Sequence, residues 1–330
     1  MRAYLYHQYG PPSVLKLEDR PKPVPAANEV LIRVHAASIN PYDWHFMRGS
    51  PYLLRLMAGL RQPKDPRLGA DLAGEVEAVG GNVSQFKSGD TVFGVGKGAF
   101  AEFACALESQ IAPKPTNISF AQAAAVPIAG LTALQALRKA GLHQQNVRTI
   151  SPHNVLINGA AGGVGTFSVQ IAKALGAYVT AVCSTRNVEM VRALGADQVI
   201  DYTSEDFTKT GQRYDIILDN VGNRSLLACR RLLVPKGFYI AAGGSAGRWM
   251  VGPIARAVVS LTLSASGSRK LFGIFAKPTS EDLTILHNLM QSGKVTPAID
   301  RRYGFAELPQ AISYLESGHA RGKVVIDVGT

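Results

Sequence analysis

The stretch VLINGAAGGVG, residues 155–165, limits the folds open to this chain more than any other feature. Residues with strand character lead into a loop almost free of side chains, and the helix-like sequence TFSVQIAKALGA follows. Gly162 is expected to let backbone approach a pyrophosphate, and Gly165 to let the helix pack closely against the strand. A helix beginning near Gly163 would direct free N–H groups at that anion. The alternative is a plain tight turn.

Strands alternate with helices from about residue 127 to 262. YVTAVC and QVIDY flank the helix-like NVEMVRALGA, and YDIILDNVG leads into NRSLLACRRLL. This alternation predicts a parallel sheet connected by right-handed crossovers.

The two ends of the chain differ from this middle part. Residues 1 to about 125 indicate short strands and turns, as in DLAGEVEAVG and SGDTVFGV. The tail holds two helix-like segments and a final strand, GKVVIDV, and is expected to rejoin the first domain.

The residues that end the second strand of the alternating region indicate which cofactor the glycine loop binds. An NAD-binding loop usually places Asp or Glu there, about 20 residues beyond the glycines, to bind the ribose diol. This chain has AVCSTRN instead, in which Ser184 and Arg186 suit a phosphate dianion. The expected cofactor is therefore NADPH. The alternative is that Arg186 is an ordinary solvated residue that opens a helix. Tyr202 lies over the adenine end or packs in the core.

Composition and charge narrow the class of protein. The chain has 330 residues, is 46% hydrophobic and carries a formal charge of +11. The charges are scattered rather than clustered, so the excess is expected mainly to solvate the surface, with some steering of phosphorylated ligands. No face of Lys and Arg interleaved with aromatic residues is visible, so nucleic acid is an unlikely partner. The three cysteines show no pairing or metal-site spacing, and the start of the chain lacks a signal-peptide layout. No segment reads as a membrane span. The sequence predicts a soluble, cytoplasmic protein.

Four motifs resemble the medium-chain dehydrogenase/reductase superfamily, and more closely its zinc-free quinone oxidoreductase branch. They are INGAAGGVGTFSVQIAKALGA, CSTRNVEMVRALGADQVIDYT, GADLAGEVEAVGGNVSQFKSGDTVFG and GHARGKVVIDV. The resemblance implies an α/β fold. Residues 127–265 would form a Rossmann domain with a doubly wound parallel sheet. Residues 1–126, completed by 266–330, would form a GroES-like β-rich partial barrel. The resemblance also implies an active site in the cleft between the domains and a homodimer.

The resemblance also bears on a metal site. Zinc alcohol dehydrogenases of this superfamily have Cys at the position of Asn40, His-Glu at Ala70–Asp71, and a third ligand near Pro127–Ile128. These residues do not make a zinc-ligand set, so no metal is expected. Without a Lewis acid, acceptors that delocalise charge become more suitable, namely quinones and α,β-unsaturated carbonyls. The predicted reaction is hydride transfer from NADPH to such an acceptor.

The family resemblance further implies roles for individual residues. The implied cofactor contacts are Thr132, Ala161, Gly162, Gly163, Val164, Ser184, Arg186, Tyr202, Asn220, Val221, Gly243, Phe275, His319, Ala320, Arg321 and Lys323. The catalytic candidates are Asn40 and Asp43, which would orient water or substrate, and Tyr52, which would donate to the substrate oxygen. The alternative for these three is a purely structural hydrogen-bond role.

An apolar segment, residues 247–270, contains Trp249 and Met250. It would line the pocket of a hydrophobic acceptor or a subunit contact, or simply pack between the domains.

Three other functions remain open at this point. The first is an enoyl-thioester reductase, whose anionic carrier group the basic charge would attract. The second is an NADPH-binding module without turnover; some relatives of this kind bind RNA, which would appear as salt-sensitive RNA retention. The third is an interaction protein similar to neurite-outgrowth interactors around FAKPTSEDL.

Overall fold

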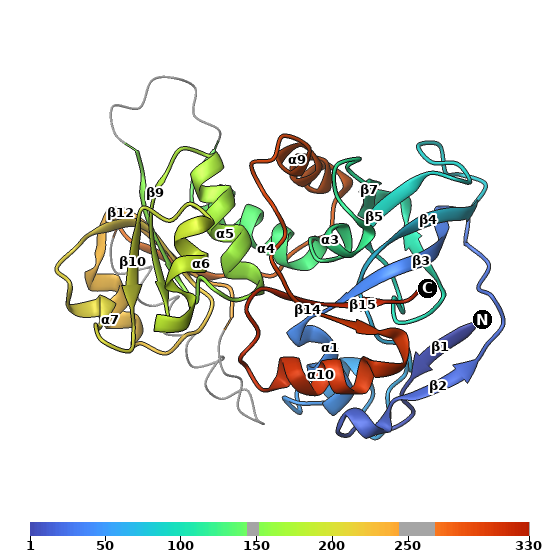
Figure 1. The fold of residues 1–330 in the computed structure, drawn as a ribbon. Coiled ribbons are helices and arrows are strands. Elements are labelled where there is room, and N and C mark those ends of the chain that lie inside the picture. The colour runs from blue at the N-terminus through green and yellow to red at the C-terminus, as the bar shows by residue number, and fades with distance from the viewer. Residues whose placement is uncertain (144–151, 244–267, 330) are drawn as a thin grey trace. The chain divides into compact units, whose positions relative to one another are not determined.

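The computed structural model describes residues 1–143, 152–243 and 268–329 (Figure 1). These residues form two compact units, the first made of residues 1–131 and 277–330 and the second of residues 132–276. Trp249 and Met250, with most of their apolar segment, lie outside the described residues. No helix in the described ranges is both long enough and apolar enough to cross a bilayer.

The second unit is built on a parallel sheet of six strands in the order β10-β9-β8-β11-β12-β13 (Figure 1). This is the strand order of a dinucleotide-binding fold, with the order reversing between β8 and β11. Its strands are β8 (Asn154–Asn158), β9 (Tyr178–Cys183), β10 (Gln198–Asp201), β11 (Tyr214–Asp219), β12 (Leu233–Ala241) and β13 (Lys270–Gly273). The described helices between them are α5 (Gly163–Ala174), α6 (Val188–Ala193) and α7 (Leu226–Arg231). The predicted Rossmann architecture is confirmed.

Local sequence explains why β8 and α5 form where they do. Residues 155–158 of β8 are all buried, as expected of a strand with neighbours on both sides in a parallel sheet. Helix α5 is buried from Gly165 to Ala172, and its buried polar side chains bond to the helix's own carbonyls. Ser168 donates to the carbonyl of Val164 at 2.8 Å, and Gln170 to that of Thr166 at 3.0 Å. The helix begins at Gly163, as predicted.

The first unit is built mainly from β-strands. Its larger sheet has the order β14-β15-β3-β4-β5-β7, with β6 also paired to β3, and β1 pairs with β2 in a separate sheet. The strands are β1 (Arg2–Leu5), β2 (Lys16–Asp19), β3 (Glu29–Ile39), β4 (Asp71–Val79), β5 (Thr91–Val95), β6 (Phe103–Leu107), β7 (Ile111–Pro113), β14 (Ile299–Gly304) and β15 (Lys323–Asp327). The helices are α1 (Pro41–Arg48), α2 (Leu54–Ala58), α3 (Phe120–Ala124), α9 (Ser280–Gln291) and α10 (Leu308–Glu316), while α4 (Pro127–Lys139) spans the boundary between the units.

The C-terminal segment completes the core of the first unit. Strand β15 pairs antiparallel with β3, so that Val324 lies opposite Ile39. Leu308 and Ile312, four residues apart on α10, are fully buried in the same hydrophobic cluster. This register carries Lys323, which precedes Val324, to the end of β3, where Asn40 follows Ile39.

Candidate active site

The candidate cofactor residues of the second unit gather along one edge of its sheet. Because the strands are parallel, their carboxyl ends meet at this edge, where ligands bind in open α/β sheets. Residues 161–164 follow β8, Ser184 and Arg186 follow β9, and Tyr202 follows β10. Asn220 and Val221 follow β11, and Gly243 follows β12. Five separate chain segments therefore contribute to one edge.

The glycine loop leaves its backbone open at one point and packs tightly at another. A Cβ at Gly165 would overlap the carbonyl oxygen of Gly159 and the backbone of Ala160. A Cβ at Gly162 would have only the Gly159 oxygen nearby, at 3.6 Å. Gly162 is also the N-cap of α5, and it has no side chain to satisfy the first N–H groups of the helix. The loop can therefore present bare N–H groups to an anion such as a pyrophosphate.

Asn220 lies where the strand order reverses. Its backbone N–H and its Nδ2 both donate to the carbonyl oxygen of Asn158, at 3.1 and 3.0 Å. Its Oδ1 is buried and has no hydrogen-bond partner within the described residues. Buried acceptors are nearly always satisfied, so this oxygen fits a donor group on a bound ligand. The edge of the sheet accordingly fits a dinucleotide with ribose hydroxyls.

Asp219 is an organising residue that the sequence analysis did not identify. Its side chain is buried at the end of β11, where Oδ1 accepts from the N–H groups of Val221 and Gly222 at 3.1 and 2.8 Å. Oδ1 also accepts from Asn158 Nδ2 at 2.8 Å, and Oδ2 accepts from the Tyr239 hydroxyl at 2.6 Å. The carboxylate thus fixes the turn that carries Asn220. The available signal was an acidic residue directly after the apolar run IIL, residues 216–218.

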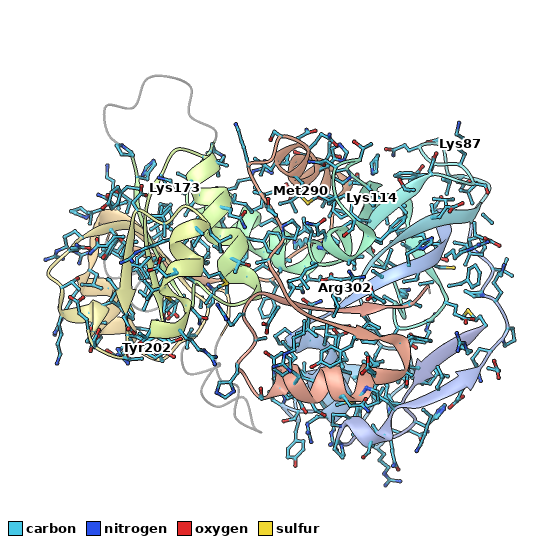
Figure 2. All side chains as sticks on the ribbon, in the orientation of Figure 1. Lys87, Lys114, Lys173, Tyr202, Met290 and Arg302 are labelled. Atoms are coloured by element: carbon cyan, nitrogen blue, oxygen red, sulfur yellow. The ribbon has the colours of Figure 1, made fainter. Side chains whose placement is uncertain are left out.

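The adenosine end of the edge contains a carboxylate that the sequence analysis also overlooked. No acid follows β9, but Asp201 at the end of the neighbouring β10 accepts from the Thr185 hydroxyl at 2.6 Å. This hydrogen bond and those from Thr203 lower the pKa of Asp201. Arg186 is exposed, and the ring of Tyr202 is half exposed (Figure 2).

The remaining cofactor candidates vary in exposure. Thr132 is buried in α4, and Phe275 is 90% exposed. A Cβ at Gly243 would overlap the carbonyl oxygen of Asn220. In the first unit, His319 and Arg321 have exposed side chains, and Ala320 is half-buried. None of these positions is tested by a bound ligand, so their roles stay predictions.

Lys323 belongs to a buried polar cluster of the first unit. Its Nζ is 2.6 Å from Oδ1 of Asn40 and 3.3 Å from Oδ2 of Asp71. Asp71 Oδ2 also accepts from Asn40 Nδ2 and from the Ser38 hydroxyl, at 2.8 and 2.9 Å. Its Oδ1 accepts from the N–H of Ile128 at 3.0 Å. The structure therefore brings Lys323 together with the catalytic candidate Asn40, and the sequence analysis did not anticipate the Lys323–Asp71 pair.

Asp43 is fully buried and holds the start of α1. Its Oδ2 accepts from the N–H of Asn40 at 2.8 Å, and its Oδ1 accepts from the N–H of Gly69 at 3.1 Å. Burial raises its pKa from 3.8 to about 7, against the lowering effect of the two backbone hydrogen bonds. Tyr52, the third catalytic candidate, lies just before α2, and the guanidinium of Arg55 sits 4.9 Å from its ring centre.

The positions that hold zinc in zinc-dependent relatives do not suit a zinc ion here. Zn²⁺ prefers thiolate, imidazole and carboxylate ligands in a tetrahedral set. Asn40, Asp71 and Ile128 supply one carboxylate, and the Lys323 ammonium already lies against it. No group of three or more His, Cys, Asp or Glu side chains placed to hold a metal occurs in the described ranges.

Two family models match the chain. Residues 26–116 match the alcohol dehydrogenase GroES-like domain, and residues 194–326 match a model described as zinc-binding dehydrogenase. These ranges cover most of the β-rich first unit and the later strands of the parallel sheet.

Individual proteins are similar over almost the whole chain. The mitochondrial NAD(P)H oxidoreductase RTN4IP1 of Bos taurus is 34% identical, covering 99% of this chain and 89% of its own length. The 2-methylene-furan-3-one reductase of Solanum lycopersicum is 35% identical, covering 99% and 79%. The solved structure of the quinone oxidoreductase from Coxiella burnetii is 35% identical, covers 100% of this chain and 99% of its own, and has a TM-score of 0.85.

The parallel sheet with its bare glycine loop, the β-rich unit and the full-length similarities point to one family. The fold and these relatives also support a nicotinamide cofactor for this chain. The chain is an oxidoreductase that belongs to the medium-chain dehydrogenase/reductase superfamily, in its quinone oxidoreductase branch.

Proposed function

We propose that the chain transfers a hydride from NADPH to a quinone or to an α,β-unsaturated carbonyl compound without the help of a metal ion. The observation that carries this proposal is the ammonium of Lys323, which is 3% exposed and lies against Asn40 and Asp71. A divalent cation beside this ammonium would be repelled, so an alkoxide would lack a Lewis acid. Acceptors that spread negative charge over a conjugated oxygen need no such ion.

The second unit supplies groups that fit the cofactor. The N-terminus of α5 and the open backbone at Gly162 suit the pyrophosphate, and the partnerless Oδ1 of Asn220 suits a ribose hydroxyl. Arg186 and Ser184 suit the additional phosphate of NADPH. When bound, NADPH supplies the hydride.

The first unit supplies groups that position the acceptor. Both oxygens of Asp43 accept backbone hydrogen bonds, and the amide of Asn40 bonds to Lys323 and Asp71. The Asp43 hydrogen bonds therefore hold the start of α1 in place, and the hydrogen bonds of the Asn40 amide orient its side chain. The Tyr52 hydroxyl remains our candidate donor to the acceptor oxygen, because the nearby Arg55 guanidinium favours negative charge at that place.

The test is NADPH oxidation by protein treated with a chelator and shown to be metal-free by elemental analysis. A panel of quinones, enones and enoyl thioesters would be compared. We expect turnover with quinones or enones that is unchanged by added zinc. Absence of oxidation above background with both classes would overturn the proposal, and turnover with enoyl thioesters alone would assign the chain to thioester reduction.

The choice of NADPH over NADH has its own test, a titration of both cofactors into wild type and Arg186→Ala. The substitution should weaken NADPH binding by about 1.5 to 3 kcal/mol, the scale of a charge-assisted hydrogen bond, and leave NADH almost unchanged. Arg192→Ala is the matched control, because Arg192 is an exposed cation of α6 that pairs with Glu189 at 2.8 Å. Equal losses for both cofactors would contradict the assignment of Arg186. A homodimeric state and a cytoplasmic location stay predictions.

A further inference from the structure

Helix α2 is fastened to the first unit at both ends. Nε of Arg55 donates to the carbonyl oxygen of Gly49 at 2.9 Å, and the guanidinium lies between the rings of Tyr9 and Tyr52, 4.5 and 4.9 Å from their centres. The Tyr9 hydroxyl donates to the carbonyl oxygen of Gly59 at 2.6 Å. These contacts fix the helix in place with polar and aromatic groups.

The apolar side chains of α2 and its flanks point into solvent. Leu56, Met57 and Leu60 are 63%, 77% and 67% exposed, and Leu53 is 46% exposed. No residue of α2 is buried. A helix held against a domain normally buries its apolar side chains, and contiguous exposed apolar side chains mark an interaction surface. We call Leu53, Leu56, Met57 and Leu60 the α2 face.

Cations outnumber acidic residues around the α2 face, although Asp65 follows Lys64 and Glu316 pairs with Arg48. Between residues 41 and 64 the only acidic residue is Asp43, which is fully buried. The same stretch contains Arg48, Arg55, Arg61 and Lys64. Arg61 and Lys64 are exposed, and neither has an ion-pair partner among the residues that the structure describes. Apolar side chains beside unpaired cations are the composition of an interfacial membrane segment.

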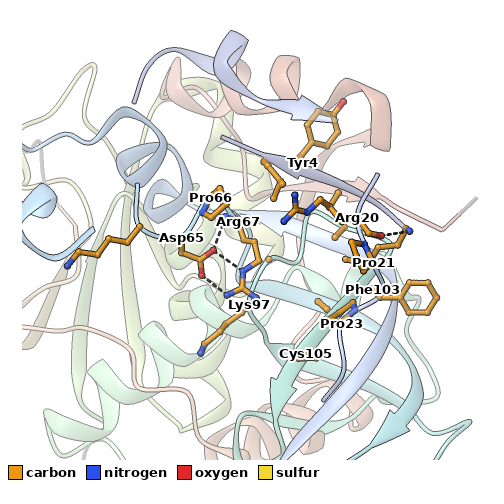
Figure 3. Close-up of a pocket in the computed structure, with 17 residues that line it drawn as sticks. Tyr4, Arg20, Pro21, Pro23, Asp65, Pro66, Arg67, Lys97, Phe103 and Cys105 are labelled. Atoms are coloured by element: carbon orange, nitrogen blue, oxygen red, sulfur yellow. Dashed lines mark hydrogen bonds and ion pairs between the residues drawn. The ribbon is translucent and has the colours of Figure 1, made fainter. Parts of the chain in front are cut away.

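A basic pocket of the first unit includes Lys64, six residues beyond the end of α2, and Figure 3 shows the residues that line it. It has a volume of about 470 Å³ and is lined by four cationic side chains, Arg20, Lys64, Arg67 and Lys97, and by one acidic side chain, Asp65. Asp65 is engaged by Arg67, with Oδ1 and Oδ2 accepting at 2.8 and 2.6 Å. Among the described residues, Arg20 and Lys64 form no ion pair, and the charge of Lys97 helps to lower the pKa of Asp65.

The pocket and the α2 face are continuous along the backbone. The N–H of Lys64 donates to the carbonyl oxygen of Ala58, the last residue of α2, at 2.7 Å. Lys64, which lines the pocket, is therefore bonded directly to the C-terminal end of the helix that carries the α2 face.

We propose that the α2 face and the basic pocket together dock on an anionic lipid bilayer. The apolar side chains enter the boundary between headgroups and acyl chains, and the pocket cations meet lipid phosphates. An anionic bilayer matches both features at once, whereas an acidic peptide would leave the apolar side chains unexplained. A two-fold contact between copies of the chain would set this cationic surface against itself. The proposal does not rest on the proposed reaction.

The test is co-sedimentation with vesicles in the absence of cofactor and acceptor. Wild type should bind vesicles of equal parts phosphatidylcholine and phosphatidylglycerol, bind phosphatidylcholine vesicles far less, and dissociate at high salt. The double variant Lys64→Ala/Lys97→Ala should lower the partition coefficient roughly 10- to 30-fold, from about 1 kcal/mol per cation near the surface. Leu56→Ser/Met57→Ser should lower it about tenfold or more, because it removes two apolar side chains that the bilayer would otherwise bury.

Two control variants remove the same kinds of group elsewhere. Lys87→Ala/Lys294→Ala deletes two exposed cations, and Leu227→Ser deletes a leucine that is 54% exposed on α7. Both controls should bind vesicles as wild type does. Wild type that stays in the supernatant with anionic vesicles would overturn the proposal, as would unchanged binding by both test variants. If Leu56→Ser/Met57→Ser instead halves the mass in sedimentation equilibrium without any vesicle binding by wild type, the α2 face is a contact between copies.

Discussion

Lys323 donates a 2.6 Å hydrogen bond from Nζ to Oδ1 of Asn40, although 283 residues separate the two in sequence. The same ammonium lies 3.3 Å from Oδ2 of Asp71, and both side chains of this ion pair are at most 3% exposed. A buried charge pair contributes little net stability, but removing one partner leaves an uncompensated buried charge. The buried Asp71 carboxylate therefore relies on the Lys323 ammonium as its charge partner.

Lys323→Met should destabilise the protein by about 3–5 kcal/mol, because Asp71 would lose its buried partner. The measurement is urea denaturation monitored by circular dichroism. Lys22→Met is the matched control, since Lys22 pairs with Glu77 at 2.6 Å on the surface and should cost less than about 1 kcal/mol. Equal losses in the two variants would contradict the buried-pair interpretation.

The two loop glycines should respond differently to a methyl group. Gly165→Ala forces its Cβ into the Gly159 carbonyl and the Ala160 backbone, which should destabilise the protein by about 1–3 kcal/mol. Gly162→Ala meets its nearest atom at 3.6 Å, so it should fold normally yet weaken cofactor binding by crowding the pyrophosphate. Thermal denaturation measures the first effect and cofactor titration the second. A destabilised Gly162→Ala with unimpaired binding would reverse these assignments.

Asn220→Ala removes the buried Oδ1 that lacks a partner within the described part of the chain. It should weaken NADPH and NADH alike, each by about 1 kcal/mol for one lost hydrogen bond. Because the loss does not involve the adenosine phosphate, it differs from that expected for Arg186→Ala. Isothermal titration with both cofactors measures it, with Asn288→Ala, an exposed position on α9, as the control. Selective loss of NADPH alone would mean that Asn220 lies near the phosphate.

The folding stability of the protein should depend on pH because of Asp43. Its pKa is raised from 3.8 to about 7 by burial, so the folded state retains a proton that the unfolded state has lost. The stabilisation that this retained proton gives the folded state is therefore complete below about pH 3.8 and is lost as the pH rises towards 7. The slope cannot exceed about 1.4 kcal/mol per pH unit, the limit for one proton.

The measurement for Asp43 compares urea denaturation of wild type and Asp43→Asn across this pH range. The stability of wild type relative to the variant should fall as the pH rises. Asp201→Asn is the contrasting control: hydrogen bonds lower the pKa of Asp201, so its contribution should be lost as the pH falls. A flat difference between wild type and Asp43→Asn would show that Asp43 is ionised throughout.

Elements were predictable where the signal lies in neighbouring residues. YVTAVC corresponds to β9 (Tyr178–Cys183), and the start of YDIILDNVG to β11 (Tyr214–Asp219), because runs of apolar and β-branched residues favour a buried strand. The glycine loop and the start of α5 at Gly163 followed from the same local pattern. Parallel strands share one carboxyl edge, so a correct prediction of the strands also predicts that the candidate residues just after them lie along the same edge.

Local patterns did not reveal which charged groups meet. Asp201 bonds to Thr185 because β10 and β9 are neighbours, a pairing that spacing alone does not specify. The sequence analysis assigned no element to residues 54–58, and only the tertiary structure shows a helix there with exposed apolar side chains.

The sequence by itself determined the parallel sheet, its bare loop and the absence of a carboxylate after β9, because strand periodicity and glycine content are properties of adjacent residues. Only the tertiary structure decided that Lys323 would meet Asn40 and Asp71, across 283 and 252 residues. A buried ammonium is tolerated only when folding brings it a carboxylate and hydrogen-bond acceptors. That condition depends on the register of β15 against β3, which no short stretch of the chain encodes.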